Sequence, residues 1–185
     1  MPESDAIALA GADPERLAAA IHAEAIGDEA RAARLRAGAQ QSAAETPSDL
    51  DTARRFQTVL ELGYLVASAD GFDDRERSSL ARLLESITGA ALDHDVLELH
   101  FRDLDEGVAA LGRRERLARV AADLEVEHDR VEALELATLI ALADGTLGAP
   151  ELDVLVEAGG HMDIAPAKVR ALVDGVGARV KARLA

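Results

Sequence analysis

Apolar residues recur every three or four positions along most of the chain, which is the spacing of one face of an α-helix. One such stripe begins at a capping box, in which Asp73 and Glu76 can satisfy the first free N–H groups of a helix. It consists of Leu80, Leu83, Leu84 and Ile87, and Gly89 ends it. Similar stripes predict helices over about 47–70, from Asp93 or Asp95 to Leu104, over 105–111, 117–124, 131–143 and 149–158, and from Pro166 onward. The chain is therefore predicted to be all-α, a compact bundle of about seven helices.

The helix predicted over residues 131–143 is apolar nearly all round in its C-terminal half. A helix of this kind is surrounded by other helices rather than lying at the surface. We therefore expect it at the centre of the bundle, with the amphipathic helices packed around it.

Residues 1–46 differ from the rest, because large apolar side chains are sparse there and Leu35 is the only one between Ile26 and Leu50. A segment of this composition gains little free energy from burial. We interpret it as an Ala-rich helical or partly disordered arm, and an interaction or targeting arm is the alternative. The folded domain is expected to span residues 47–185, starting where Thr46 and Pro47 form a helix start.

The chain contains an internal repeat. The segment from Glu61 to Gly71 aligns with that from Glu135 to Gly145, with seven of eleven positions identical at a separation of 74 residues. Both copies end a predicted helix with Ala-Asp-Gly and continue into a helix with an early glutamate. The repeat predicts one helix–turn–helix unit used twice, which places two equivalent acidic turns in the domain.

The acidic turns are the candidate functional residues. Gly71 suits the left-handed conformation that ends many helices, but Asp70 stands at the negative end of a helix dipole, as its counterpart Asp144 does. One interpretation is that these aspartates accept hydrogen bonds from their own turn or from a helix start. The other is that they bind Ca²⁺ or Mg²⁺, or a basic protein surface. The candidate metal ligands are Asp70, Glu76, Asp144 and Glu151.

Other clusters carry weaker signals. Residues 103–107 have a faint resemblance to a calcium loop, but they read more simply as a helix end followed by an acidic helix start. His100 lies on an apolar stripe and is expected in the core. Glu125 and His128 form a single Glu-x-x-His motif, whereas a di-iron bundle needs two. We expect no catalytic residues, because the sequence shows neither a nucleophile motif nor a phosphate-binding loop.

The amino-acid composition disfavours several classes of binding partner. The formal net charge is −15, which disfavours nucleic acid and anionic membranes, and a base-stacking platform is not expected where aromatic residues make up 2%. The absence of cysteine excludes thiolate metal sites and a cysteine nucleophile. No apolar stretch approaches the ~20 residues of a membrane span, and the N-terminus does not resemble a signal peptide. These features predict a cytoplasmic protein whose partners are cations or basic protein surfaces.

The two Ala-Asp-Gly turns resemble those of the TerB-like family, helical domains of bacterial tellurite-resistance and related stress systems. The matching segments are Leu65–Gly71 with Glu76 and Leu139–Gly145 with Glu151, and the resemblance covers about residues 50–183. It implies a bundle of about seven helices in which the duplicated acidic turns are suspected of binding metal. The same module occurs in some J-domain co-chaperones, but this chain has no His-Pro-Asp signature.

Three functional hypotheses follow. The first is a non-enzymatic TerB-like binding module of a bacterial stress or metal-response system, whose acidic turns bind a divalent cation or a basic partner. The second is a scaffold or cargo protein docked through the arm of residues 1–46. The third is a metal-dependent enzyme that uses the same carboxylates, and it is disfavoured because the sequence shows no clustered histidines and carboxylates.

Overall fold

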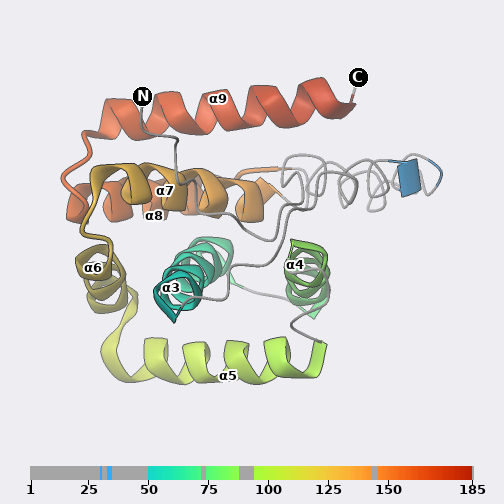
Figure 1. Cartoon of the computed structure of the whole chain (residues 1–185), viewed down its shortest axis with the longest axis horizontal. Helices are drawn as coiled ribbons and strands as arrows, with labels where there is room; N and C mark the ends of the chain where they lie inside the picture. The colour runs from blue at the N-terminus through green and yellow to red at the C-terminus, as the bar shows by residue number, and fades with distance from the viewer. Residues whose placement is uncertain are drawn as a thin grey trace.

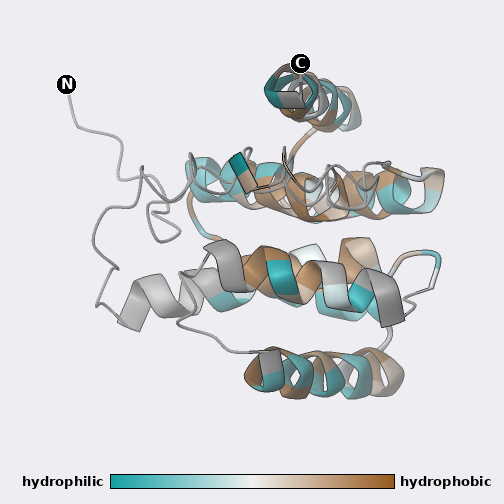
Figure 2. Cartoon of the chain, turned by 90° about the vertical axis from the view of Figure 1, so that its right-hand side faces the viewer, coloured by the Kyte–Doolittle hydropathy of each residue, from teal (hydrophilic) through white to brown (hydrophobic). Residues whose placement is uncertain are grey.

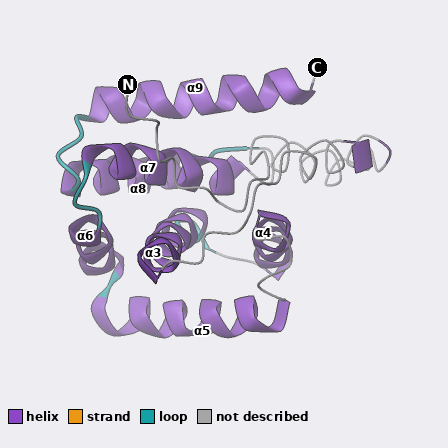
Figure 3. Ribbon diagram, viewed as in Figure 1, coloured by secondary structure: helices purple, strands orange, loops and turns teal. Residues whose placement is uncertain are grey.

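The computed structural model describes residues 30, 33–34, 50–71, 74–87, 94–142 and 146–184, and the prediction of an all-α bundle is confirmed for them. They form seven named helices and no β-strand (Figure 3). The helices are α3 (Leu50–Ala67), α4 (Asp74–Ile87), α5 (His94–Leu111), α6 (Arg113–Asp123), α7 (Glu127–Ala141), α8 (Ala149–His161) and α9 (Pro166–Leu184). The predicted arm over residues 1–46 lies outside the described residues except for three positions.

The helices stack in four levels (Figure 1). Helix α9 lies uppermost and α7 and α8 lie beneath it, followed by a level that contains α3, α4 and α6. Helix α5 runs along the opposite side of the molecule from α9. This arrangement leaves one face of α5 and one face of α9 directed away from the bundle.

The centre of the bundle is the pair α3 and α7, which are the first helices of the two sequence repeats. As predicted, α7 is buried around its C-terminal half, from Ala137 to Ala141. Gly63 of α3 lies so close to Ile140 of α7 that a Cβ atom at Gly63 would overlap the Ile140 Cδ1 atom. The first glycine of the repeat segment therefore serves the close approach of two helices rather than a turn, and any side chain there would have to displace the end of the Ile140 side chain.

Three groups of buried side chains hold the helices together, and the hydropathy colouring shows apolar residues interspersed with polar ones along the helices (Figure 2). The largest joins α3, α6, α7, α8 and α9 around residues such as Leu62 and Leu134. A second joins α3, α4, α5 and Ile140 of α7 around Tyr64 and Phe101, whose rings stack with centroids 5.3 Å apart. A third joins Leu139 of α7 to the C-terminal half of α9.

Several predicted boundaries were wrong, including the start of α7, which lies at Glu127 rather than near residue 131. Residues 94–104 and 105–111 form the single helix α5, so the calcium-like segment 103–107 lies inside a helix and is not a loop. Its residues are acceptable in a helix, and Gly107 alone lowers helix stability by only about 1 kcal/mol. Helix α8 continues to His161, past the predicted end at residue 158. Gly159 lies inside the helix, where a Cβ atom would overlap the Val169 Cγ2 atom of α9, so this glycine serves helix packing and does not end the helix.

Candidate functional site

The first acidic turn follows the end of α3 and is built by the backbone. The N–H of Ser68 donates to the carbonyl of Tyr64 at 2.9 Å, and the N–H of Ala69 donates to the carbonyl of Val66 at 3.0 Å. Gly71 has φ +118°, a conformation that favours glycine, as the sequence predicted. Asp70 stands between these positions and is exposed to solvent.

An arginine from another helix compensates the negative end of α3. Arg113, the first residue of α6, donates from its two terminal nitrogens to the carbonyls of Ser68 at 2.6 Å and Ala69 at 3.2 Å. A cation at a helix C-terminus interacts favourably with the dipole and satisfies carbonyls that lack helical partners. The unfavourable interaction between the Asp70 carboxylate and the negative end of α3 is therefore reduced by a residue 43 positions later in the chain.

The second repeat contributes the start of α8. The carboxylate of Glu151 accepts a hydrogen bond from the Gly148 N–H at 2.6 Å, and the Glu151 side chain is buried. This is the glutamate half of a capping box, since glycine has no side chain to supply the other half. Glu151 is thus a helix cap in this structure, which agrees with its predicted place as the third helical residue.

The two repeats meet at Gly148. A Cβ atom built there would lie 3.4 Å from Glu151 Oε2 and 3.8 Å from Asp70 Oδ2, so both carboxylates approach the same point. Asp70 therefore lies beside the N-terminus of α8, the helix start of the opposite repeat. The positive N-terminal end of α8 attracts the Asp70 carboxylate. This is a second favourable interaction, after that of Arg113, against the unfavourable electrostatic energy of Asp70 at the end of α3.

The predicted ligand set is thus located in part. The structure brings Asp70 and Glu151 together, whereas Asp144 and the side chain of Glu76 lie outside the described residues. Within the described ranges, no group of three or more histidine, aspartate or glutamate side chains is arranged to hold a metal ion. His128 is exposed and lies 3.5 Å from Glu132, far from the arrangement that a di-iron site needs.

His100 lies partly buried on α5, and its Nε2 atom is enclosed by protein without a hydrogen-bond partner. The expectation that it belongs to the interior rather than to a ligand cluster agrees with this position. His161 is the exposed last residue of α8.

One polar cluster was not predicted from the sequence. The Tyr64 hydroxyl of α3 donates to Oδ1 of Asp105 on α5, and Arg77 of α4 donates to Oδ2 of Asp105 at 2.8 Å. Burial, together with the Asp105 carboxylate, raises the pKa of Tyr64 well above its usual range. Burial tends to raise the pKa of Asp105 as well, but hydrogen bonds from Tyr64 and Arg77 outweigh it and lower that pKa. The cluster connects α3, α4 and α5, and the Arg77 guanidinium lies over the Phe101 ring, 5.8 Å from its centroid. The only signal for this cluster in the sequence was the lone tyrosine on an apolar stripe.

No family model matches the chain, and neither the curated proteins nor the solved structures contain a match. None of the helices in the described part of the chain combines the length and apolar character that crossing a membrane requires.

Proposed function

We propose that this chain is a non-enzymatic binding module that takes a divalent cation between the acidic turn at Asp70 and the start of α8. The observation that carries the proposal is the approach of Asp70 Oδ2 and Glu151 Oε2 to the same point beside Gly148. Both oxygens lie within 4 Å of the position that a Cβ atom of residue 148 would take, so a cation beside that position is attracted by two negative charges. Oxygen ligands from carboxylates favour Ca²⁺ or Mg²⁺ over softer metals.

The accessible partner in this pair is Asp70, because Glu151 is buried and already accepts the Gly148 N–H. A cation would therefore enter from the Asp70 side and complete its coordination with water, as Mg²⁺ commonly does. The duplicated Ala-Asp-Gly turns support placing the module among TerB-like stress or metal-response proteins. A basic protein surface, presenting a lysine or arginine to the same two carboxylates, is the alternative ligand.

The direct test is thermal unfolding followed by circular dichroism while CaCl₂ or MgCl₂ is added. A ligand at 100 times its Kd stabilises a fold by about 2.7 kcal/mol, which raises the Tm of a domain of this size by roughly 5–10 °C. NaCl at matched ionic strength gives the shift that is due to screening alone. A Tm rise no larger than that in NaCl contradicts cation binding.

The matched control uses a second exposed aspartate at a helix end. Asp70→Asn removes the accessible carboxylate, while Asp123→Asn makes the same change in charge at the end of α6. We expect Asp70→Asn to abolish the cation-dependent rise in Tm and Asp123→Asn to retain it. Combining Asp70→Asn with Asp144→Asn extends the test to both turns. Equal loss in the Asp70 and Asp123 variants would show a general charge effect instead of a site.

A further inference from the structure

The helices on the two outermost levels carry opposite charge. Helix α9 has five basic residues and one acidic residue, although the whole chain has a net charge of −15. Helix α5 has five acidic residues and one arginine. The two helices lie on opposite sides of the molecule (Figure 1), so these charges cannot compensate one another within one chain.

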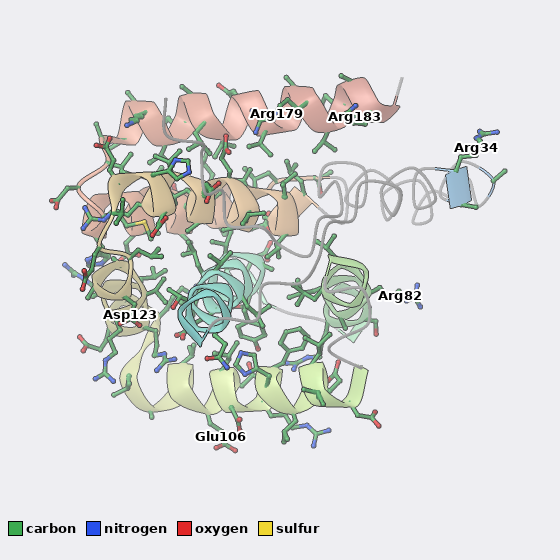
Figure 4. All side chains as sticks on the ribbon, viewed as in Figure 1. Arg34, Arg82, Glu106, Asp123, Arg179 and Arg183 are labelled. Atoms are coloured by element: carbon green, nitrogen blue, oxygen red, sulfur yellow. The ribbon has the colours of Figure 1, made fainter. Side chains whose placement is uncertain are left out.

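The outward face of α5 has a defined pattern. Asp95, Leu99, Arg102 and Glu106 are spaced four, three and four positions apart, which places them on one line along the helix. All four are exposed, and Leu99 retains 60% of its accessible surface. Glu106 projects from α5 away from the bundle (Figure 4). Among the described residues, none of the three charged members of this line forms an ion pair.

The outward side of α9 has the complementary pattern. Arg170, Asp174, Ala178 and Lys181 are exposed and lie along one side of that helix, away from the stripe of valines that packs on the bundle. The remaining basic residues include Lys168 and Arg179, which pair with Glu127 and Glu135 of α7, both at 3.0 Å. Arg170, Asp174 and Lys181 form no ion pair with any residue that the structure describes.

We propose that the outward face of α5 on one molecule binds the outward side of α9 on a second copy of this chain. In one antiparallel register, Asp95 meets Lys181, Arg102 meets Asp174 and Glu106 meets Arg170. The outer positions of each helix are eleven residues apart, or about 16 Å at 1.5 Å per residue, so the spacings match. Leu99 then lies over Gly177 and Ala178, where small residues leave room for it.

This geometry determines the kind of assembly. Each molecule uses two different faces, so the contact is head-to-tail and produces an open chain or a ring rather than a closed two-fold dimer. A single pair of helices buries a small interface, and exposed ion pairs contribute little individually. The association is therefore weak and depends on concentration, and the charge pattern supplies its specificity.

Two charge-reversed variants test the register. The first carries Asp95→Lys and Glu106→Lys on α5, and the second carries Arg170→Glu and Lys181→Glu on α9. Sedimentation equilibrium should show the average mass of the wild type rising with concentration, while each variant alone stays monomeric. An equimolar mixture of the two variants should associate again, because each mutated face then meets a complementary one.

A third variant controls for net charge. Asp123→Lys with Asp153→Lys changes the charge as much as the α5 variant does, at exposed positions on α6 and α8. It should associate like the wild type. A monomeric wild type at every concentration, a mixture that fails to associate, or loss of association in this control would each overturn the proposal. A wild type that stops at a dimer would also contradict the head-to-tail contact, and circular dichroism verifies that every variant is folded.

Discussion

Removing the Asp105 carboxylate tests how the α3–α4–α5 cluster contributes to stability. Asp105→Ala takes away the acceptor of the Tyr64 hydroxyl and one partner of Arg77. Tyr64 keeps only 1% of its accessible surface, so water cannot easily replace the lost acceptor. The Asp105 side chain itself is 52% exposed, so its ion pair with Arg77 is screened by solvent.

The expected magnitude follows from these two exposures. A buried donor left without an acceptor costs about 1–3 kcal/mol, whereas an exposed ion pair contributes about 0.2–1 kcal/mol. Asp105→Ala should therefore lower the free energy of unfolding by about 2 kcal/mol, mostly through Tyr64. If Tyr64→Phe is introduced first, Asp105→Ala should cost less than about 1 kcal/mol, because no hydroxyl is then left unsatisfied.

Urea unfolding followed by circular dichroism measures the four proteins of this double-mutant cycle. Asp103→Ala is the matched control, since Asp103 is exposed on the same helix two positions away. A loss below about 0.5 kcal/mol for Asp105→Ala, or the same loss with and without the Tyr64 hydroxyl, would refute the reasoning.

Four further outcomes are expected. The pKa of Asp105 is lowered in the folded state, so the stabilisation that its carboxylate contributes is complete above the unfolded pKa near 3.8 and is lost as pH falls through the folded pKa. Asp105→Asn should therefore flatten the acid limb of a plot of unfolding free energy against pH. Because the pKa of Tyr64 is raised, stability should fall as pH rises above 10, and absorbance of this single tyrosine near 295 nm should show ionisation only on unfolding. Arg113→Gln should lower the free energy of unfolding by about 1–2 kcal/mol in urea titrations, since two carbonyls lose a charged donor, and an unchanged midpoint would contradict that role. Gly63→Ala should cost about 1–3 kcal/mol, and Ile140→Val, which removes the overlapping Cδ1 atom, should recover part of it in thermal unfolding.

Local signals in the sequence predicted the helices well. Pro166 marks the start of α9, and the apolar character of residues 137–141 identified the central helix. The break predicted near residue 105 was wrong because acidic residues that can start a helix are also tolerated inside one. Such ambiguity is resolved by packing, here by burial of Leu104 against the second core group, and packing cannot be read from a local pattern.

The site was predictable only as a list of residues. The repeat identified Asp70 and Glu151, but it did not indicate that the turn of one repeat lies beside the helix start of the other. The contact of Arg113 with the carbonyls of residues 68 and 69 was equally hidden, because the partners are far apart in sequence and one of them is backbone. Contacts of this kind depend on how the helices cross, and a single sequence carries no local signal for that.

The pairing of α3 with α7 affects how the chain folds as it is synthesised. Helix α3 packs more extensively against α7 than against any other described helix, yet three helices separate them in the chain. A nascent chain that ends before Glu127 therefore exposes the Gly63 face of α3 to solvent. Most helical bundles fold fast because their contacts are local, and this one must wait for a distant partner. The ribosome-bound chain that ends before Glu127 is accordingly the stage at which this apolar face is most open to aggregation.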